Sequence, residues 1–389
     1  MLIDSLMRNY SRSQSPSKKP VPVKVEVTIQ DISELSVLSN SFTADLWFSS
    51  LWQDERLAFD HLDHCRQNLS FDDTFESRIW SPNVCIVNSK VSKVHTSPKP
   101  NVLLMLMQNG TVWLNYRVRV EAPCVYELSD FPMDKIVCSL YLESYSYNTA
   151  TVKIDWLENA VTLATTEFSA SDYAFVGIKH AKHTEYYKAG EWYRLTVDIQ
   201  FKRRYGFYIL QIYIPSYIYV VISFITFVIE LKALPARVIL TVNTLMSLCL
   251  QFGNIIGSLP PVSYVKSIDY FMFTCIAFIF ASTVELAFIA YQEKKLFMSS
   301  LRFNFSLKSI ISCRWVYTEP AKEHDEEYEL LRLQRRFQKN NWRLRKKLFM
   351  DRGSRIDKIS FVMFPTAFLL FNLLYWGFYL TKTRGNDEF

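Results

Sequence analysis

The chain has 389 residues and a formal net charge of +6, and 49% of its residues are hydrophobic. With 15% aromatic residues in addition, this composition is too apolar on average for an ordinary soluble protein. No Walker loop, βαβ unit, catalytic constellation or zinc-type spacing of cysteines and histidines occurs in the sequence. We therefore expect neither an enzyme nor a protein that binds a metal, a cofactor or nucleic acid.

The N-terminal half mixes charged and apolar residues. Residues 1–20 are polar and lack the apolar core of a signal peptide, so we expect a disordered leader. Alternating apolar residues then predict strands throughout residues 21–204, as in Thr111–Val120. Short turn signals separate these stretches, and strands at this spacing predict a β-sandwich. Asn68 and Asn109 begin sequences that fit the glycosylation pattern, which is a weak signal.

Long apolar stretches with few charged residues follow in the second half of the chain, at about residues 205–229, 238–257, 268–291 and 356–381. Each is close to the roughly 20 apolar residues that a membrane-spanning helix needs. The sequence therefore predicts an integral membrane protein with one large soluble half and four spans.

A basic loop, residues 292–355, joins the third and fourth spans. Between Gln292 and Lys358 there are 17 Lys and Arg against 9 Asp and Glu, and such an excess marks the cytoplasmic side of a membrane. Both termini, including the tail at residues 382–389, are then extracellular. Residues 328–355 are predicted to form a basic amphipathic helix that continues into the fourth span. Attraction of an interfacial helix to anionic lipid is one interpretation of its charge, and the lining of lateral exits for anions is the other.

The extracellular half contains two cysteines, Cys124 and Cys138, that enclose the apolar and acidic turn Phe131-Pro132-Met133-Asp134. Disulfides persist outside the cell, so this pair is most simply a disulfide that closes a loop between two strands. Two free buried thiols are the alternative.

The cysteine spacing and the turn together resemble the signature loop of the Cys-loop receptors, the pentameric ligand-gated ion channels. Further segments resemble the family along nearly the whole chain: Trp52–Leu57, Trp80-Ser81-Pro82, Gln211–Ser216, Leu259–Lys266 and Ile356–Trp376. The resemblance implies a β + α membrane protein, with an extracellular ligand-binding β-sandwich followed by a four-helix transmembrane bundle. It also implies assembly with four further homologous subunits in the lipid bilayer of the plasma membrane, at a synapse.

The second span is the least hydrophobic, and the resemblance identifies it as the pore helix. Helical spacing places Ile239, Asn243, Met246 and Leu250 on one face. Asn243 would hydrate the inner half of a channel, and rings of Met246 and Leu250 would gate it by dewetting. A helix with scattered polar residues packed against its neighbours is the alternative.

Three residues at the start of this span, Pro235, Ala236 and Arg237, bear on ion selectivity. The cation-selective branch of the family has a glutamate at the position of Ala236, so this chain resembles the chloride-conducting branch. We expect a five-fold ring of Arg237 to favour anions at the inner mouth. The alternative is that Arg237 only anchors the end of a helix.

The resemblance also implies an agonist site between subunits. The principal face would contribute Glu143, Tyr145, Tyr187 and Trp192, and the complementary face Trp47, Ser49, Asn115 and Arg117. Ser49 stands where GABA-gated members carry an arginine for the agonist's carboxylate, whereas Trp192 offers a ring face to a cation. We therefore expect acetylcholine or a biogenic amine, with Glu143 as a further contact. GABA is the alternative, because Arg117 could hold its carboxylate, and packing in the sandwich core is the alternative role for the aromatic residues.

These features predict a subunit of a neurotransmitter-gated chloride channel that looks most like nematode members. Agonist binding is expected to close the Trp192 loop, and Asp134, Arg203 and Lys266 are expected to couple this motion to the pore. A non-conducting accessory subunit that needs partner subunits is the other class of function. Both homomeric and heteromeric pentamers fit the sequence.

Overall fold

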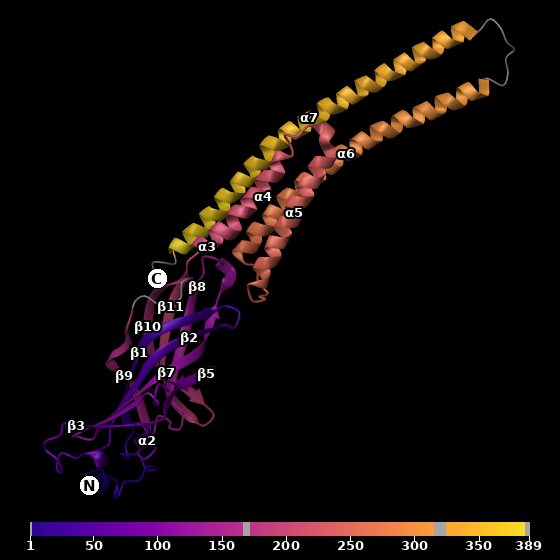
Figure 1. Ribbon diagram of the computed structural model, residues 1–389. Helices are drawn as coiled ribbons and strands as arrows, with labels where there is room; N and C mark the ends of the chain where they lie inside the picture. The colour runs from indigo at the N-terminus through magenta and orange to yellow at the C-terminus, as the bar shows by residue number, and fades with distance from the viewer. Residues whose placement is uncertain (1, 166–171, 315–323, 386–389) are drawn as a thin grey trace. The chain divides into compact units, whose positions relative to one another are not determined.

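The computed structural model describes residues 2–165, 172–314 and 324–385. The chain divides into two compact units, one made of Met1–Tyr205 with Leu259–Val262 and the other of Gly206–Ser258 with Ser263–Phe389. The first unit consists mainly of strands and the second of helices (Figure 1).

The strands of the first unit follow one another with short connections. They are β1 Val21–Ser36, β2 Ser41–Gln53, β3 Asn68–Phe71, β4 Val84–Ile86, β5 Val91–Val94, β6 Val102–Met107, β7 Thr111–Tyr126, β8 Lys135–Ser144, β9 Val152–Leu163, β10 Tyr173–Tyr187 and β11 Gly190–Arg203. Short helical segments interrupt them: α1 Leu2–Met7, η1 Glu55–Leu57, α2 Asp73–Glu76 and η2 Leu128–Asp130.

The strand order along the main path is β10-β11-β8-β7-β2-β1-β9. β7 belongs to two sheets, because most of its length pairs with β2 while its last residues, Cys124–Tyr126, pair with β8. Alternate residues on these strands point inward, and side chains such as Leu46, Leu114, Leu140 and Ile199 share one hydrophobic core. The predicted β-sandwich is therefore confirmed.

The first 20 residues correct the sequence-based expectation of a disordered leader. Leu2–Met7 form helix α1, and its apolar side chains and Tyr10 pack against the sandwich core. The Tyr10 hydroxyl donates to Asp54 at 2.8 Å and accepts from the backbone amide of Trp80 at 2.9 Å. The segment is polar on average, but it contains apolar residues at helical spacing. These residues pack against the sandwich core.

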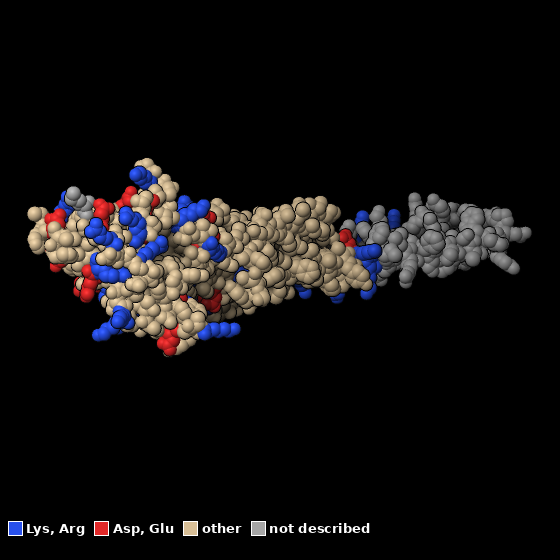
Figure 2. Space-filling model, turned by 90° about the horizontal axis from the view of Figure 1, so that it is seen from below, with Lys and Arg blue, Asp and Glu red and all other residues tan. Residues whose placement is uncertain are grey.

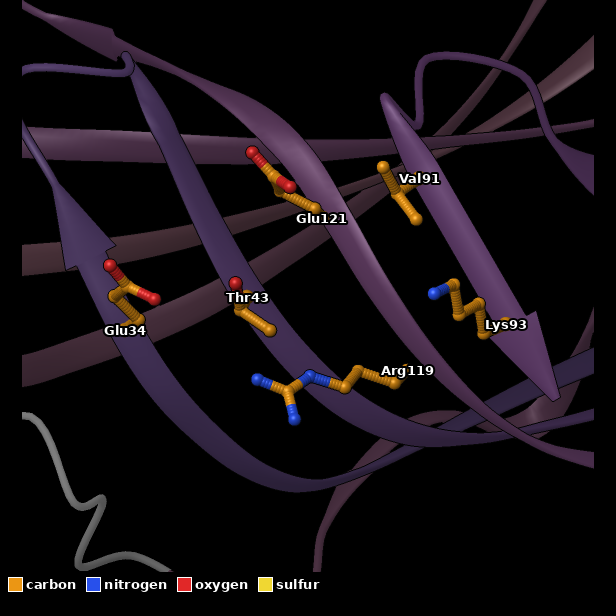
Figure 3. A pocket seen from close by; sticks show the side chains of 6 residues that line it. All are labelled: Glu34, Thr43, Val91, Lys93, Arg119 and Glu121. Carbon is orange, nitrogen blue, oxygen red and sulfur yellow. The ribbon is translucent and has the colours of Figure 1, made fainter. Parts of the chain in front are cut away.

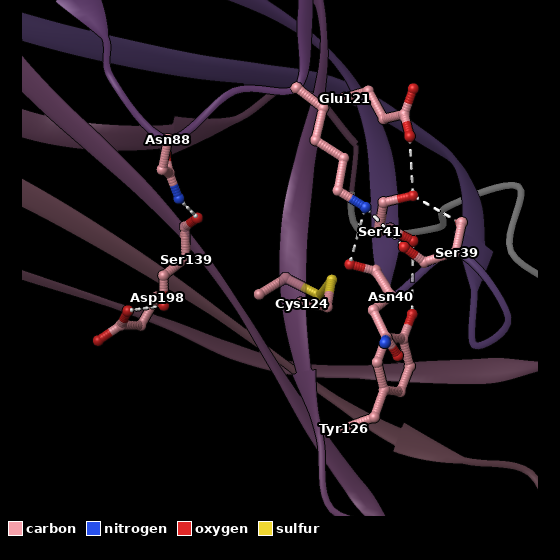
Figure 4. Close-up of a disulfide and its surroundings, with 11 residues drawn as sticks. Ser39, Asn40, Ser41, Asn88, Glu121, Cys124, Tyr126, Ser139 and Asp198 are labelled. Atoms are coloured by element: carbon pink, nitrogen blue, oxygen red, sulfur yellow. Dashed lines mark hydrogen bonds between the residues drawn. A yellow bond between two sulfur atoms is a disulfide. The ribbon is translucent and has the colours of Figure 1, made fainter. Parts of the chain in front are cut away.

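The disulfide predicted between Cys124 and Cys138 is present (Figure 4). The two cysteines are direct cross-strand partners at the point where β7 pairs with β8, and their Cα atoms lie 4.2 Å apart. The loop between β1 and β2 is bound beside them, because the Cys124 amide donates to the Asn40 carbonyl at 3.2 Å. Antiparallel pairing thus places both thiols for oxidation, which explains the spacing in the sequence.

The second unit contains the helices α3 Gly206–Tyr208, η3 Ile209–Tyr213, α4 Ile214–Ile225, η4 Leu231–Ala233, α5 Leu234–Gly257, α6 Ser267–Arg314 and α7 His324–Gly385. Stretches long and apolar enough to cross a membrane are Gly206–Ile225, Leu231–Gly257, Ser267–Lys295 and Met350–Thr383. Few charged side chains lie over these stretches on the face seen in Figure 2, whereas both signs of charge are scattered over the strands. The four predicted spans are present as helices.

The ends of the helices differ from the expected spans in two places. α6 continues to Arg314, beyond the end expected near residue 291. The helix expected at residues 328–355 lies within α7, which runs without a break into the fourth span and ends at Gly385. The expected extracellular tail is therefore helical over its first part, and its last residues, 386–389, lie outside the described residues.

Candidate functional site

A buried carboxylate at the end of β8 organises the predicted principal face. Glu143 is 4% exposed and faces Arg194 directly in the antiparallel pairing of β8 with β11. The Arg194 Nε atom donates to Glu143 Oε1, and the Tyr187 hydroxyl donates to Glu143 Oε2 at 3.1 Å. Arg194 Nη1 also reaches Glu185 at 2.8 Å. The Glu143 carboxylate therefore already holds a cation of its own chain.

Arg194 and Glu185 were missed by the sequence analysis. Their signal in the sequence was weak: both lie on the β10–β11 hairpin, where charged residues flank pairs of aromatic residues. Cross-strand register, and not sequence distance, brings Arg194 to Glu143 across 51 residues. This finding corrects the expectation that Glu143 is available to contact an amine.

The aromatic residues of this face stand at the rim of the same cluster. Tyr187 and Trp192 meet edge to face, with ring centroids 5.5 Å apart. The hairpin turn that joins their strands includes Gly190, whose φ of +132° favours glycine. Tyr145 is 75% exposed and Tyr187 is 47% exposed. These exposures exclude the alternative that the two tyrosines are buried in the sandwich core.

The Glu143 carboxylate also affects groups beside it that titrate. Cys85 on β4 lies opposite Glu143 in register. Burial raises the pKa of the Cys85 thiol, and the negative charge of Glu143 raises it further. Burial and the same carboxylate likewise raise the pKa of Tyr187. Both groups therefore stay protonated at neutral pH.

The predicted complementary face lies on the other sheet, on β2 and β7. Trp47 pairs in register with Arg117, and Ser49 with Asn115. The Asn115 Nδ2 atom donates to the Ser49 Oγ atom at 2.7 Å. Trp47 is 45% exposed, whereas Ser49 is 4% exposed. The exposed Trp47 thus lies next to the hydrogen-bonded pair of Ser49 and Asn115 along β2 and β7.

Arg117 is bound to an acidic residue that the sequence analysis missed. Its Nη2 atom donates to Asp45 Oδ2 at 3.2 Å, and His95 Nε2 lies 2.6 Å from Asp45 Oδ1. Asp45 precedes Trp47 by two residues, so both side chains are on the same face of β2. The eight predicted site residues consequently form two clusters, each of which pairs its own charges.

The predicted coupling residues form two separate contacts. Arg203 donates to both oxygens of Asp134, at 2.7 and 3.0 Å, and both side chains are nearly inaccessible to solvent. The guanidinium carbon of Arg203 also lies 4.9 Å from the ring centroid of Phe131 and 4.8 Å from that of Tyr173. In the helical unit, Lys266 Nζ lies 3.1 Å from the carboxylate of Asp269.

α5 has one exposed and one buried face. The residues predicted to line a pore, Ile239, Asn243, Met246 and Leu250, are all on the exposed face, as is Pro235. The buried face carries Arg237, Thr241, Thr244, Leu248 and Ile255. The helical spacing thus separates the predicted pore row from the packed side of the helix.

Arg237 is the exception among the predicted selectivity residues. Its side chain is fully buried, and its Nη2 and Nη1 atoms donate to the carboxylate of Asp357 on α7 at 2.7 and 3.3 Å. This arrangement corrects the prediction that Arg237 faces the channel mouth. A buried guanidinium needs a carboxylate to compensate its charge, and Asp357 provides it here.

The remaining predicted sites are the two glycosylation sequences. Asn68 and Asn109 are exposed, at the start of β3 and in the turn before β7, and they stay predicted glycosylation sites. Among the described residues, no group of three or more His, Cys, Asp and Glu could hold a metal ion.

Two family descriptions match the chain. The neurotransmitter-gated ion-channel ligand binding domain matches residues 1–205, and the neurotransmitter-gated ion-channel transmembrane region matches residues 212–302. The first match includes the N-terminal residues that were expected to be a leader. The boundary between the two matches agrees with the division of the chain into a unit of strands and a unit of helices.

Curated relatives from Caenorhabditis elegans are similar over most of the chain. Probable ligand-gated ion channel 46 is 42% identical over 76% of this chain and 58% of its own length. Serotonin-gated chloride channel mod-1 is 42% identical over 75% of this chain and 59% of its own length. Acetylcholine-gated chloride channel subunit acc-1 is 36% identical over 98% of this chain and 90% of its own length. The matches thus span less than two thirds of the first two relatives.

Proposed function

The chain belongs to the family of neurotransmitter-gated ion channels, and we propose that it is a subunit of a pentameric anion channel opened by an extracellular amine. Relatives named as serotonin-gated and acetylcholine-gated chloride channels support this reading. The channel would lie in the plasma membrane, at a synapse, with both termini outside. Four further homologous subunits would complete the pore.

The proposed anion selectivity rests on the start of α5. Pro235 and Ala236 are exposed there and carry no charge, and the first turn of the helix adds the partial positive charge of its free amides. Five copies of this helix end would give a mouth that attracts anions. The nearby acid, Glu230, lies 3.4 Å from Lys232, which offsets its charge. Arg237 supports the mouth indirectly, by fixing α5 to α7 through Asp357.

The observation that carries the proposed agonist class is the ion pair between Arg117 and Asp45. A carboxylate-bearing agonist needs a cation, and Arg117 is the candidate on the complementary face. Because Asp45 already holds Arg117, a carboxylate would have to displace it. An agonist with a cation and no carboxylate meets no such competitor.

Aromatic rings would recognise the cation. Trp47 on one face and Tyr145, Tyr187 and Trp192 on the other present ring surfaces, and each close ring contact contributes roughly 0.5–2 kcal/mol. Glu143 does not replace them, because Arg194 and Tyr187 occupy its oxygens. Glu143 instead holds the hairpin that carries Trp192, so that closure of this hairpin over the agonist would complete the site.

GABA is the second candidate agonist, because Arg117 is within the site. The two candidates are separated by dose–response curves for acetylcholine, serotonin and GABA under voltage clamp, in oocytes that express the chain. We expect acetylcholine or serotonin to act at lower concentration than GABA, and Trp192→Ala to weaken that response severely. A GABA response at micromolar concentration without an amine response would contradict the proposed agonist class. A chain that reaches the surface but answers no transmitter would point to an accessory subunit.

A further inference from the structure

Four polar side chains that carry or can carry charge lie together on one face of the β10–β11 hairpin. Strand register sets three of them in one row, because His183 faces Arg194 on β11 and Arg194 faces Glu143 on β8. The fourth, Glu185, lies two residues from His183 along β10 and therefore on the same face. We call these four residues the hairpin cluster.

Two basic side chains of the hairpin cluster share one carboxylate oxygen. Glu185 Oε1 accepts from Arg194 Nη1 at 2.8 Å, and His183 Nε2 lies 3.3 Å from the same oxygen. His183 is also the most exposed member of the cluster, with 44% of its side chain accessible against 5% for Glu143. It can therefore exchange protons directly with solvent while its neighbours stay paired.

The charges of the hairpin cluster do not balance while His183 is neutral. In the part of the chain that the structure describes, the carboxylates of Glu143 and Glu185 share a single guanidinium, that of Arg194. Two negative charges against one positive charge leave a net charge of −1, and a proton on His183 brings it to zero. The pocket on β1, β2, β5 and β7 shows the contrast, because its lining combines two acidic and two basic side chains (Figure 3): Glu34, Glu121, Lys93 and Arg119. In the hairpin cluster a single proton thus separates a negative state from a neutral one.

His183 belongs to the residue type whose charge changes in the neutral pH range, whereas carboxylic acids and guanidinium groups keep their charges there. The other titratable groups that face the cluster, on β10, β8 and β4, are Tyr187, Tyr141 and Cys85. Burial raises the pKa of Tyr187 and of Cys85, so both stay neutral in this range. Further along the hairpin, Lys179 and Asp198 face each other with opposite charges. The charge of the cluster between about pH 6 and pH 8 therefore follows His183.

We propose that His183 is a proton-binding site that regulates the affinity of the agonist site for cations, an inference that rests on the proposed function. Glu185 pairs in register with Trp192, and Arg194 Nη2 donates to the Tyr187 hydroxyl at 2.8 Å. The hairpin cluster thus adjoins two of the rings proposed to hold the agonist. A negative cluster attracts a cationic agonist, and a proton on His183 cancels that attraction. One unit charge about 8 Å from the agonist, partly screened by solvent, changes its affinity roughly three- to ten-fold.

The test is equilibrium binding of acetylcholine and of serotonin to the purified full chain in lipid nanodiscs, at about pH 6 and about pH 8. Both amines stay cationic over this range, so their own charge does not change. His183→Gln is neutral at both pH values, whereas His183→Lys is positive at both. His180→Gln, on the opposite face of β10, is the matched control. His95→Gln reports the second histidine of the proposed site, which lies beside Asp45 on the complementary face.

We expect amine binding to the unmodified chain to weaken as pH falls. The ratio of the affinities at pH 8 and pH 6 should be roughly three- to ten-fold smaller in His183→Gln than in the unmodified chain. At pH 8, His183→Lys should bind the amine roughly three- to ten-fold more weakly than His183→Gln. His180→Gln should behave as the unmodified chain does.

Two kinds of result would overturn the proposal. Equal ratios for the unmodified chain and His183→Gln, or equal affinities of the Gln and Lys variants at pH 8, would remove His183 from this role and leave the proposed agonist class intact. A pH dependence that disappears only in His95→Gln would do the same, because it would place the proton on the complementary face. Absence of binding of both amines to the unmodified chain at either pH would overturn the proposed agonist class and this inference together.

Discussion

Both oxygens of Asp357 on α7 bind the guanidinium of Arg237 on α5, at 2.7 and 3.3 Å. Both side chains are buried, so each charge depends on the other. The pair connects the helix proposed to line the pore with the helix at the end of the chain. It also removes the most conspicuous positive charge of the second span from the exposed face of that helix.

Removing one member of this pair should be more harmful than removing both. Arg237→Gln or Asp357→Asn leaves an uncompensated buried charge or polar group, which costs about 3–5 kcal/mol for a buried ion pair. We expect either single variant to lower surface expression and thermal stability in detergent. The double variant Arg237→Met with Asp357→Leu should recover much of both. It should also keep its ion selectivity, and a double variant that reached the surface with altered selectivity would place Arg237 at the pore.

The Arg203–Asp134 pair makes a similar prediction for the strand unit. Arg203→Lys keeps the charge but loses the two-fold hydrogen bond to Asp134 and the planar contact with Phe131 and Tyr173. We expect a loss of roughly 1.5–3 kcal/mol, measured as a lower melting temperature of the purified chain. Arg204→Lys, at the exposed neighbouring position, is the control. Equal melting temperatures for the two variants would contradict this role for Arg203.

Release of Arg117 should change which agonists act. Asp45→Asn removes the negative charge that holds Arg117, so Arg117 becomes available to a carboxylate. We expect the GABA concentration for half-maximal current to fall about ten-fold, which corresponds to about 1.4 kcal/mol. The response to an amine without a carboxylate should stay nearly constant and serves as the internal control. Parallel shifts for both agonists would show that Asp45 acts on the fold and not on agonist choice.

The Cys85 thiol gives a pH-dependent test of the Glu143 cluster. Burial and the adjacent Glu143 carboxylate raise the pKa of Cys85, so little reactive thiolate forms at pH 7 and the thiolate fraction grows as pH rises. We expect iodoacetamide to modify Cys85 slowly at pH 7 and faster at higher pH, with the exposed Cys65 as the reference in the same chain. Glu143→Gln should accelerate modification of Cys85. Mass spectrometry of the two peptides would contradict this if Cys85 reacted as fast as Cys65.

Local patterns in the sequence predicted the architecture well. Alternation identified the strands, apolar length identified the spans, and the cysteine spacing predicted a disulfide whose thiols the β7–β8 pairing brings together. The prediction of a disordered leader at residues 1–20 was wrong, because it relied on the average polarity of the segment. A few apolar residues within it pack against the sandwich core.

The electrostatic partners could not be predicted in the same way. Arg237 lies 120 residues from Asp357, Arg117 lies 72 residues from Asp45, and Arg194 lies 51 residues from Glu143. Each pair depends on strand register or helix packing, which a local pattern does not contain. The sequence analysis therefore treated the charges of these candidate site residues as free, whereas the structure pairs them.

Anion conduction is measured most directly as the reversal potential of the agonist-evoked current while external chloride is replaced by a large impermeant anion at constant sodium. The start of α5 has no acidic residue in its first turn and carries the partial positive charge of its free amides. It therefore predicts a positive shift that approaches about 59 mV for each ten-fold reduction in chloride, the limit for a monovalent ion. Replacement of external sodium at constant chloride should leave the reversal potential unchanged. A reversal potential that followed sodium and ignored chloride would contradict the proposed anion channel.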